Sequence, residues 1–200
     1  MIDKRKFYIN GKWTNPITKN DFEVINPSNE ESYAVISLGS LVDLNFAINA
    51  AKDAFFSWSQ TDKKEKIILL ENLLKIYKKR WDEITKTMSD EMGAPIDWSS
   101  SAQTASGADH INDFILRLKN FKFESRFDKN SNNYIVYEPI GVCGLITPWN
   151  WPINQITLKV IPALATGCTM ILKPSEIAPL SGMLFAEIVH EAGFPPGVFN

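Results

Sequence analysis

The chain contains 200 residues, of which 44% are hydrophobic and 22% are charged, and its 21 Lys and Arg against 23 Asp and Glu give a formal net charge of −2. This length supports one sizeable domain, or one and a fraction, with its own hydrophobic core. The near balance of charges gives no electrostatic reason to expect nucleic acid or an anionic membrane surface as a partner.

Targeting signals and cysteines indicate the compartment. Residues 1–9 carry charges with no apolar stretch behind them, so they do not look like a signal peptide. No apolar run approaches the roughly 20 residues needed to span a bilayer. The two cysteines, Cys143 and Cys168, are too few for a disulfide framework. We therefore expect a cytoplasmic protein without a membrane segment.

The N-terminal part of the sequence predicts strands first and helices after them. An Asn-Gly dipeptide at 10–11 favours a tight hairpin, because both residues accept positive φ, and further short strands are expected at 22–25 and 33–38. Ser40 and Asp43 have the spacing of a capping box and predict the start of a helix.

Two more amphipathic helices are predicted around 67–77 and 111–118, where apolar residues recur at three- and four-residue spacing. His110 lies on the second of these, and no other ligand-type residue follows it at metal spacing, so we predict no metal site. Residues 121–138 alternate again around a polar turn. We expect a long hairpin there, projecting from the main body.

From residue 141 the sequence changes character. Short apolar runs without alternation at 142–146 and 169–172 are typical of strands buried on both faces. Helical segments are predicted at 153–165 and 181–192, and a third apolar run begins at 198–200. This β-α-β-α-β order predicts a parallel sheet with crossover helices. Because a domain does not normally stop inside a strand, we expect a truncated sequence.

The first predicted strand end carries Asn150 between Pro148 and Pro152. Because ligands of open parallel sheets sit outside the carboxyl ends of the strands, a side chain held between two fixed prolines is well placed for chemistry. Its amide could donate to developing negative charge, as in an oxyanion hole. It could equally cap the helix that follows. Both interpretations stand.

The second strand end carries Lys173, Ser175 and Glu176. A Lys and a Glu three residues apart could contact adjacent hydroxyls of a ribose, one as donor and one as acceptor. A surface ion pair at the start of a helix is the other interpretation, and local sequence favours it. No GxGxxG motif follows either strand, so these residues alone indicate no more than a nucleotide-binding α/β enzyme.

Five motifs in order carry a family resemblance. They are Glu-Pro-Ile-Gly-Val-Cys-Gly at 138–144, Thr-Pro-Trp-Asn-Trp-Pro at 147–152, Pro-Ala-Leu-Ala-Thr-Gly-Cys-Thr at 162–169, Lys-Pro-Ser-Glu at 173–176 and Glu-Ala-Gly-Phe-Pro-Pro-Gly-Val-Phe-Asn at 191–200. In order, spacing and placement they resemble the NAD(P)-dependent aldehyde dehydrogenase superfamily. Compatible N-terminal segments are found at 7–11, 26–27 and 91–95.

The resemblance implies an α/β fold: a truncated aldehyde-dehydrogenase-type, Rossmann-like cofactor domain that lacks GxGxxG. Residues 1–120 would supply its N-terminal strands and helices. Residues 121–139 would form an oligomerisation hairpin, and residues 140–200 the first βαβα part of the NAD-binding unit.

The resemblance also implies roles for individual residues. Asn150 would be the oxyanion-hole amide, and Lys159 matches a lysine assigned to proton relay in some relatives. The adenosine ribose would be held by Lys173 and Glu176, and the carboxylate of Glu176 would repel a 2′-phosphate, which favours NAD and leaves NADP as the alternative cofactor. The other residues expected to contact the cofactor are Ile146, Thr147, Pro148, Trp149 and Ser175.

The implied reaction is oxidation of an aldehyde to the carboxylic acid through a cysteine thiohemiacetal and thioester. The nucleophile and the glutamate base would follow residue 200, because Cys143 and Cys168 do not match the nucleophile and are expected in the core. The implied partners are an aldehyde, NAD(P) and further copies in a homodimer or homotetramer. We expect the 200 residues alone to be inactive. The competing hypothesis is a non-catalytic nucleotide-binding or assembly module.

Overall fold

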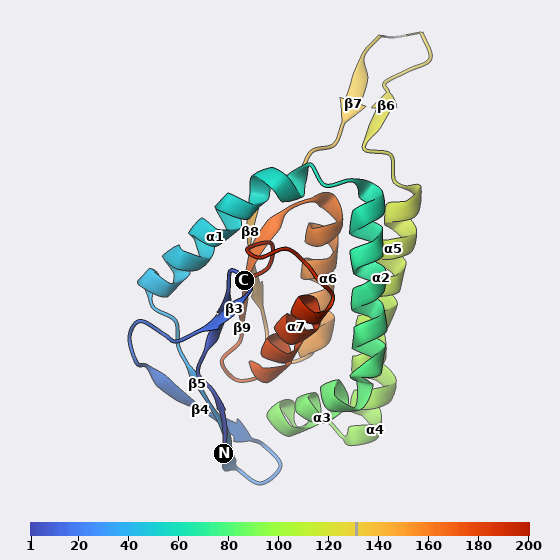
Figure 1. The fold of residues 1–200 in the computed structure, drawn as a ribbon. Helices are drawn as coiled ribbons and strands as arrows, with labels where there is room; N and C mark the ends of the chain where they lie inside the picture. The colour runs from blue at the N-terminus through green and yellow to red at the C-terminus, as the bar shows by residue number, and fades with distance from the viewer. Residues whose placement is uncertain (131) are drawn as a thin grey trace.

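The computed structural model describes residues 1–130 and 132–200, and Figure 1 shows their course as a ribbon. The strands are β1 (Ile2–Lys4), β2 (Phe7–Ile9), β3 (Lys12–Thr14), β4 (Asp21–Asn26), β5 (Glu31–Ser37), β6 (Glu124–Arg126), β7 (Tyr134–Val136), β8 (Val142–Thr147) and β9 (Thr169–Pro174). The helices are α1 (Leu41–Ser59), α2 (Lys63–Lys79), α3 (Trp81–Met92), α4 (Ile96–Trp98), a π-helix (Ser99–Thr104), α5 (Ala105–Asn120), α6 (Pro152–Thr166) and α7 (Leu180–Glu191).

The N-terminal strands form two small sheets. β5 lies between β1, which runs parallel to it, and β4, which runs antiparallel. β2 and β3 form a separate hairpin, in which Asn10 and Gly11 have φ of 51° and 74°. These left-handed values are the ones that an Asn-Gly dipeptide accepts readily, and the predicted hairpin is confirmed.

The helical region begins at the predicted capping box. Ser40 Oγ accepts a hydrogen bond from Asp43 N at 3.3 Å, and Asp43 Oδ2 accepts one from Ser40 N at 2.9 Å. The later helices α2 and α5 agree with the predicted amphipathic segments. Helix α3, in contrast, was not predicted, because only Arg80 separates it from α2 and no Gly or Pro marks the boundary.

The main hydrophobic core lies among α2, α5, α6 and α7, which Figure 1 shows side by side. α5 fits between α2 and α6 at Gly107, where a Cβ atom would lie 2.3 Å from Tyr77 Oη and 2.5 Å from Ile153 Cγ2. Tyr77 cannot easily move away, because its hydroxyl donates to Thr104 O at 2.8 Å inside the core. The close approach of these helices therefore depends on a residue without a side chain.

A parallel sheet carries the C-terminal part of the chain. β8 pairs with β9 in parallel, α6 connects them, and α7 follows β9. On the other side of β9, Met170 pairs in parallel with Phe199, and Asn200 N donates to Met170 O at 3.1 Å. The predicted β-α-β-α-β order is confirmed, with β9 in the middle.

The prediction that both apolar runs are buried on both faces is wrong for β8. Gly144 is exposed and the side chain of Ile146 is 73% exposed. The physical reason is position, because β8 lies at the edge of the described sheet, and α1 packs mainly against β9. An apolar run shows that a strand can be buried, but the layers around it decide whether it is.

The predicted hairpin forms from β6 and β7 and extends away from the helices (Figure 1). Tyr134, Ile135 and Val136 on β7 are all exposed, at 50%, 39% and 56%. In the part of the chain that the structure describes, no helix is both long and apolar enough to cross a membrane. Over the same residues, no three His, Cys, Asp or Glu side chains gather in a way that could hold a metal ion.

Candidate active site

The two predicted strand ends lie next to each other. In the parallel register, Ile146 is opposite Lys173 and Thr147 is opposite Pro174. The segment that carries Asn150 and the segment that carries Glu176 therefore leave the same edge of the sheet. Neighbouring strand ends of this kind are where open α/β sheets bind ligands.

The segment after β8 presents the side chain of Asn150 to solvent. α6 begins at Pro152, with Trp151 as its N-cap residue and no side-chain capping bond. The capping interpretation of Asn150 is therefore not realised. Within residues 1–130 and 132–200, the Asn150 amide has no hydrogen-bond partner, and Trp151 packs edge-to-face on Trp98 of α4 at 6.0 Å between ring centroids. A free amide thus stands on a segment held by aromatic packing.

The residues just before Asn150 differ in exposure along this segment. Thr147 is buried, whereas Pro148 is exposed and the Trp149 side chain is 49% exposed. Buried Thr147 anchors the end of β8, and the exposed residues beyond it leave backbone groups within reach of a ligand.

The segment after β9 carries an ion pair. Lys173 Nζ lies 3.1 Å from Glu176 Oε2, and both side chains are largely exposed. A backbone hydrogen bond at Glu176 and then its contact with Lys173 lower the pKa of the Glu176 carboxyl, so it is ionised near neutral pH. Ser175 Oγ accepts from Ile177 N at 3.3 Å and shapes the turn. The surface ion pair favoured by local sequence is present, and its exposure leaves both charges accessible to a ligand.

Lys159 is not brought to these strand ends. It lies on α6, seven residues after Pro152, which is roughly 10 Å along the helix axis. Its Nζ donates to Gln155 Oε1 at 3.1 Å, within the same helix. Among the described residues it makes no hydrogen bond or ion pair with the other predicted site residues, and its assignment to proton relay stays a prediction.

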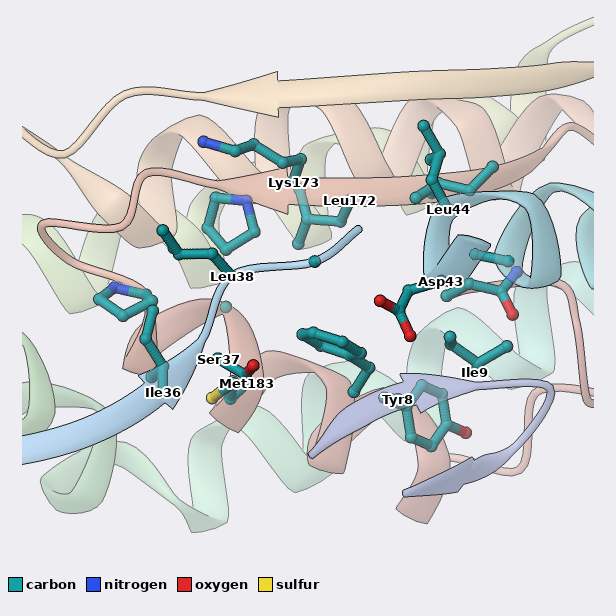
Figure 2. Close-up of a pocket in the computed structure, with 18 of the residues that line it drawn as sticks. Tyr8, Ile9, Ile36, Ser37, Leu38, Asp43, Leu44, Leu172, Lys173 and Met183 are labelled. Atoms are coloured by element: carbon teal, nitrogen blue, oxygen red, sulfur yellow. The ribbon is translucent and has the colours of Figure 1, made fainter. Parts of the chain in front are cut away.

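A cavity of about 680 Å³ lies between β9 and the N-terminal elements (Figure 2). Its walls are mostly apolar, and Tyr8 of β2, Leu38 directly after β5, Leu44 of α1 and Met183 of α7 are among the residues that line it. The residues that line it include Lys173 and Glu176 on the β9 side.

Asn150 is not among the residues that line this cavity. This cavity is therefore not a crevice shared by Asn150 and the Lys173–Glu176 pair, which the sequence had led us to expect. Asp43, the acidic residue in the opposite wall, is already engaged, because it accepts from Ile17 N and Ser40 N at 2.9 Å each.

Neither cysteine has the surroundings of a nucleophile. Cys168 is 4% exposed and belongs to the main core, and Cys143 packs against that core from β8. Burial, followed by the neighbouring Cys168, raises the pKa of the Cys143 thiol to about 11. Reactive cysteines have lowered pKa values, which the Cys143 thiol does not. The burial of Cys168 and the packing of Cys143 confirm the interpretation of both as core residues.

One contact near the site was not predicted from the sequence, although Glu91 lies in the family-like segment 91–95. The carboxylate of Glu91 on α3 is 1% exposed and accepts from Leu180 N at 2.5 Å, from Ser181 N at 3.0 Å and from the Ser181 hydroxyl. These partners lie 89 and 90 residues away along the chain, so no local pattern signals the contact. Glu91 thereby holds the start of α7, directly after the Glu176 segment.

Comparison with known proteins places these features in context. Residues 13–200 match the model of the aldehyde dehydrogenase family. The chain is 47% identical over 201 residues to a 3-succinoylsemialdehyde-pyridine dehydrogenase from a Pseudomonas species, covering 100% of this chain and 42% of that protein.

Solved structures of aldehyde dehydrogenases also match this chain. An aldehyde dehydrogenase from Bartonella henselae superposes with a TM-score of 0.98 at 58% identity, covering 100% of this chain and 42% of that one. Aldehyde dehydrogenase C from Pseudomonas syringae, solved as a mutant with NAD+ and octanal, superposes with a TM-score of 0.95 at 43% identity, covering 98% and 40%. The chain thus spans about two fifths of the length of these relatives.

Proposed function

This chain belongs to the aldehyde dehydrogenase family. On that premise we propose that the protein that contains this chain oxidises an aldehyde to the carboxylic acid with NAD+. The observation that supports this most directly is the parallel register of β8 and β9. It places Ile146 beside Lys173, so the Asn150 and Glu176 segments leave one edge of the sheet. When bound at that edge, NAD+ supplies the hydride acceptor.

The Lys173–Glu176 pair has the chemistry to hold the adenosine ribose. Its ammonium can donate to one hydroxyl and its carboxylate can accept from the neighbouring one, and both groups are exposed and 3.1 Å apart. An ionised Glu176 repels a 2′-phosphate, so we propose NAD in preference to NADP. Ser175 and the backbone of Ile146, Thr147, Pro148 and Trp149 would complete the contacts.

The position of Asn150 outside the cavity that Lys173 and Glu176 line is compatible with this assignment. A dinucleotide is a long molecule, and its adenosine ribose and its nicotinamide lie at opposite ends. Lys173 and Glu176 would hold the first end, and Asn150 would lie near the second. Trp98 and Trp151, which pack against each other beside Asn150, would then lie on the substrate side.

The free amide of Asn150 supports a role in stabilising an oxyanion. In the proposed reaction a cysteine thiolate adds to the aldehyde carbon, and the carbonyl oxygen becomes negative. The amide of Asn150 donates a hydrogen bond to that oxygen. The carbon would then give up its hydride to the cofactor and the carbonyl would reform as a thioester. Water activated by a glutamate would hydrolyse this thioester to the acid and the free cysteine.

Cys168 lies in the core and Cys143 packs against it, so neither is suited to act as the nucleophile. Because the chain spans about two fifths of its relatives, we propose that the nucleophile and the base come from the remaining part. We expect the 200-residue chain alone to show no aldehyde oxidation. The β6–β7 hairpin, with Tyr134, Ile135 and Val136 exposed, would make the contacts of a homodimer or homotetramer.

The test is aldehyde oxidation by the full-length gene product, followed as NADH formed. A panel of aldehydes should include octanal and a semialdehyde, because the names of relatives mention them. We expect Asn150→Ala to lower kcat by about 10²–10³, the loss typical of one oxyanion donor. Full activity of Asn150→Ala would refute its role. A natural gene product of only 22.6 kDa would instead favour a non-catalytic nucleotide-binding or assembly module.

A further inference from the structure

Helix α7 starts without a cap from its own segment. It begins at Leu180 after Pro179, and the N-cap residue makes no side-chain hydrogen bond to it. The first N–H groups of a helix have no partner inside the helix and need acceptors from elsewhere. Here both acceptors are carboxylate oxygens of Glu91, with Leu180 N at 2.5 Å from Oε2 and Ser181 N at 3.0 Å from Oε1.

Glu91 itself is firmly held. It lies in the last turn of α3, which ends at Gly93 with φ of 79°. Ser89 Oγ donates to Ala94 O at 2.8 Å and closes this turn, and a Cβ atom on Gly93 would lie only 2.7 Å from Pro27 Cγ. These contacts fix the C-terminal end of α3 and therefore the position of the Glu91 carboxylate.

The segment between the two fixed ends is short and carries Glu176. β9 ends at Pro174 and α7 begins at Leu180, which leaves residues 175–179 between them. Pro174 is fixed by pairing with Thr147, and its ring also lies close to Gly182, where a Cβ atom would be 3.0 Å from Pro174 Cγ. The position of Leu180 consequently determines the path of the turn.

We propose that Glu91 is a positioning residue that fixes the start of α7 and thereby sets Ser175 and Glu176 in place for the ribose of the cofactor. This inference rests on the proposed function of Glu176. Glu91 does not touch the cofactor; it acts through Leu180 and Ser181, and through the five-residue turn that precedes them.

The chemistry requires a carboxylate and not merely a polar side chain of that size. A carboxylate offers two acceptor oxygens, one for each backbone N–H. A glutamine at this position offers one acceptor and turns an NH₂ group towards the other N–H. A buried donor left without an acceptor is costly, so the first turn of α7 should loosen in Glu91→Gln.

The experiment compares Glu91→Gln with Thr85→Val in the full-length gene product at about pH 8, above the raised pKa of Glu91, so that the carboxylate is the form that is compared. Thr85 is a matched control, because it is buried on the same helix and its hydroxyl contacts Thr104 at 2.9 Å, away from α7. We expect Glu91→Gln to raise the KM for NAD+ roughly tenfold, which corresponds to one buried hydrogen bond. The kcat at saturating NAD+ should stay within about twofold, and Thr85→Val should leave the KM unchanged.

Hydrogen–deuterium exchange supplies a readout that does not depend on the cofactor. Peptides covering residues 174–184 should exchange faster in Glu91→Gln than in the wild type or in Thr85→Val. Unchanged exchange there, an equal rise in KM in both variants, or a loss of kcat at constant KM would each overturn the positioning role. A wild-type protein that neither binds nor reduces NAD+ would instead refute the proposed function, and the ribose role with it.

Discussion

The segment after β9 and the segment after β8 leave the same edge of the parallel sheet but enter their helices differently. The β9 segment runs into α7, whose first N–H groups are satisfied by the buried carboxylate of Glu91. The β8 segment runs into α6 with no side-chain cap, although Asn150 is close enough in sequence to have supplied one. Asn150 instead leaves its amide in solvent.

The difference helps to separate structural from functional polar groups. Both carboxylate oxygens of Glu91 accept hydrogen bonds, three in all, from the start of α7, so this side chain serves the fold. Asn150 makes no hydrogen bond among the residues that the structure describes, so its polarity is available to a ligand. A polar side chain that forms no hydrogen bond within the fold is a better candidate for ligand binding than one whose polar atoms are all hydrogen-bonded there.

The largest effect that we expect concerns Glu91 and pH. Burial raises the pKa of the Glu91 carboxyl from 4.5 to about 7, although Ser181 and Leu180 oppose this by donating to it. Because the folded protein then holds this proton more tightly than the unfolded chain, the free energy of unfolding is highest below the unfolded pKa and falls as the pH rises towards 7, where burial makes it costly to form the carboxylate that accepts both N–H groups of α7. The loss should be about 3 kcal/mol, at about 1.4 kcal/mol per pKa unit.

Chemical denaturation of the full-length gene product between about pH 5 and pH 7 measures this slope. Glu91→Gln is the control, because a carboxamide does not titrate and its curve should be flatter over this range. If both proteins gave the same slope, the raised pKa of Glu91 would be disproved.

The second prediction tests the packing of α5 against the first turn of α6, a helix that has no side-chain cap. Gly107→Ala would place a methyl group 2.5 Å from Ile153 Cγ2 in the first turn of α6, and the buried Tyr77 blocks the other side. We expect a loss of about 2 kcal/mol in the free energy of unfolding, as for other overpacked cores. Gly144→Ala on β8 is the control, because no atom lies within 4 Å of its added methyl group. Equal stability of the two variants would mean that α5 can shift at no cost.

The third prediction concerns the local cap of α1. Ser40→Ala removes the acceptor of Asp43 N and should lower the free energy of unfolding by about 1 kcal/mol. Ser57→Ala, an exposed serine within the same helix whose hydroxyl donates to Ala54 O, should change it little. Denaturation curves of the two variants test this, and a neutral Ser40→Ala would show that α1 is held by packing alone.

The smallest effect on stability is expected at Asn150. Because its amide has no partner in the part of the chain described, Asn150→Ala should change the free energy of unfolding by less than about 0.5 kcal/mol while activity falls. Measuring denaturation and turnover on the same preparation separates the two effects. A large loss of stability would place Asn150 with Glu91 among the structural residues.

Several features follow from local sequence because their causes lie within a few residues. The Asn-Gly turn at 10–11, the capping box at Ser40 and the order of strands and helices after residue 141 all appear in the structure. The motifs at 147–152 and 173–176 also indicated the aldehyde dehydrogenase family, which the comparisons confirm. Short-range sterics and hydrogen bonds decide such features, and they are written in adjacent residues.

Other features could not be predicted, because they depend on which distant segments meet. Helix α3 was missed for want of a boundary signal after Arg80, and the open face at Ile146 depends on which layers cover β8. The cavity walls come from elements far apart in the chain, so local sequence could not show that Asn150 would lie outside them.

The sequence by itself determined the strand ends that carry Asn150, Lys173 and Glu176, and the family to which they belong. Only the tertiary structure decided that Asn150 is free and that Glu91 caps a helix 89 residues further along. The reason is that propensity and motif act between neighbours along the chain. The pairing of a buried charge with its donors is decided by proximity in space.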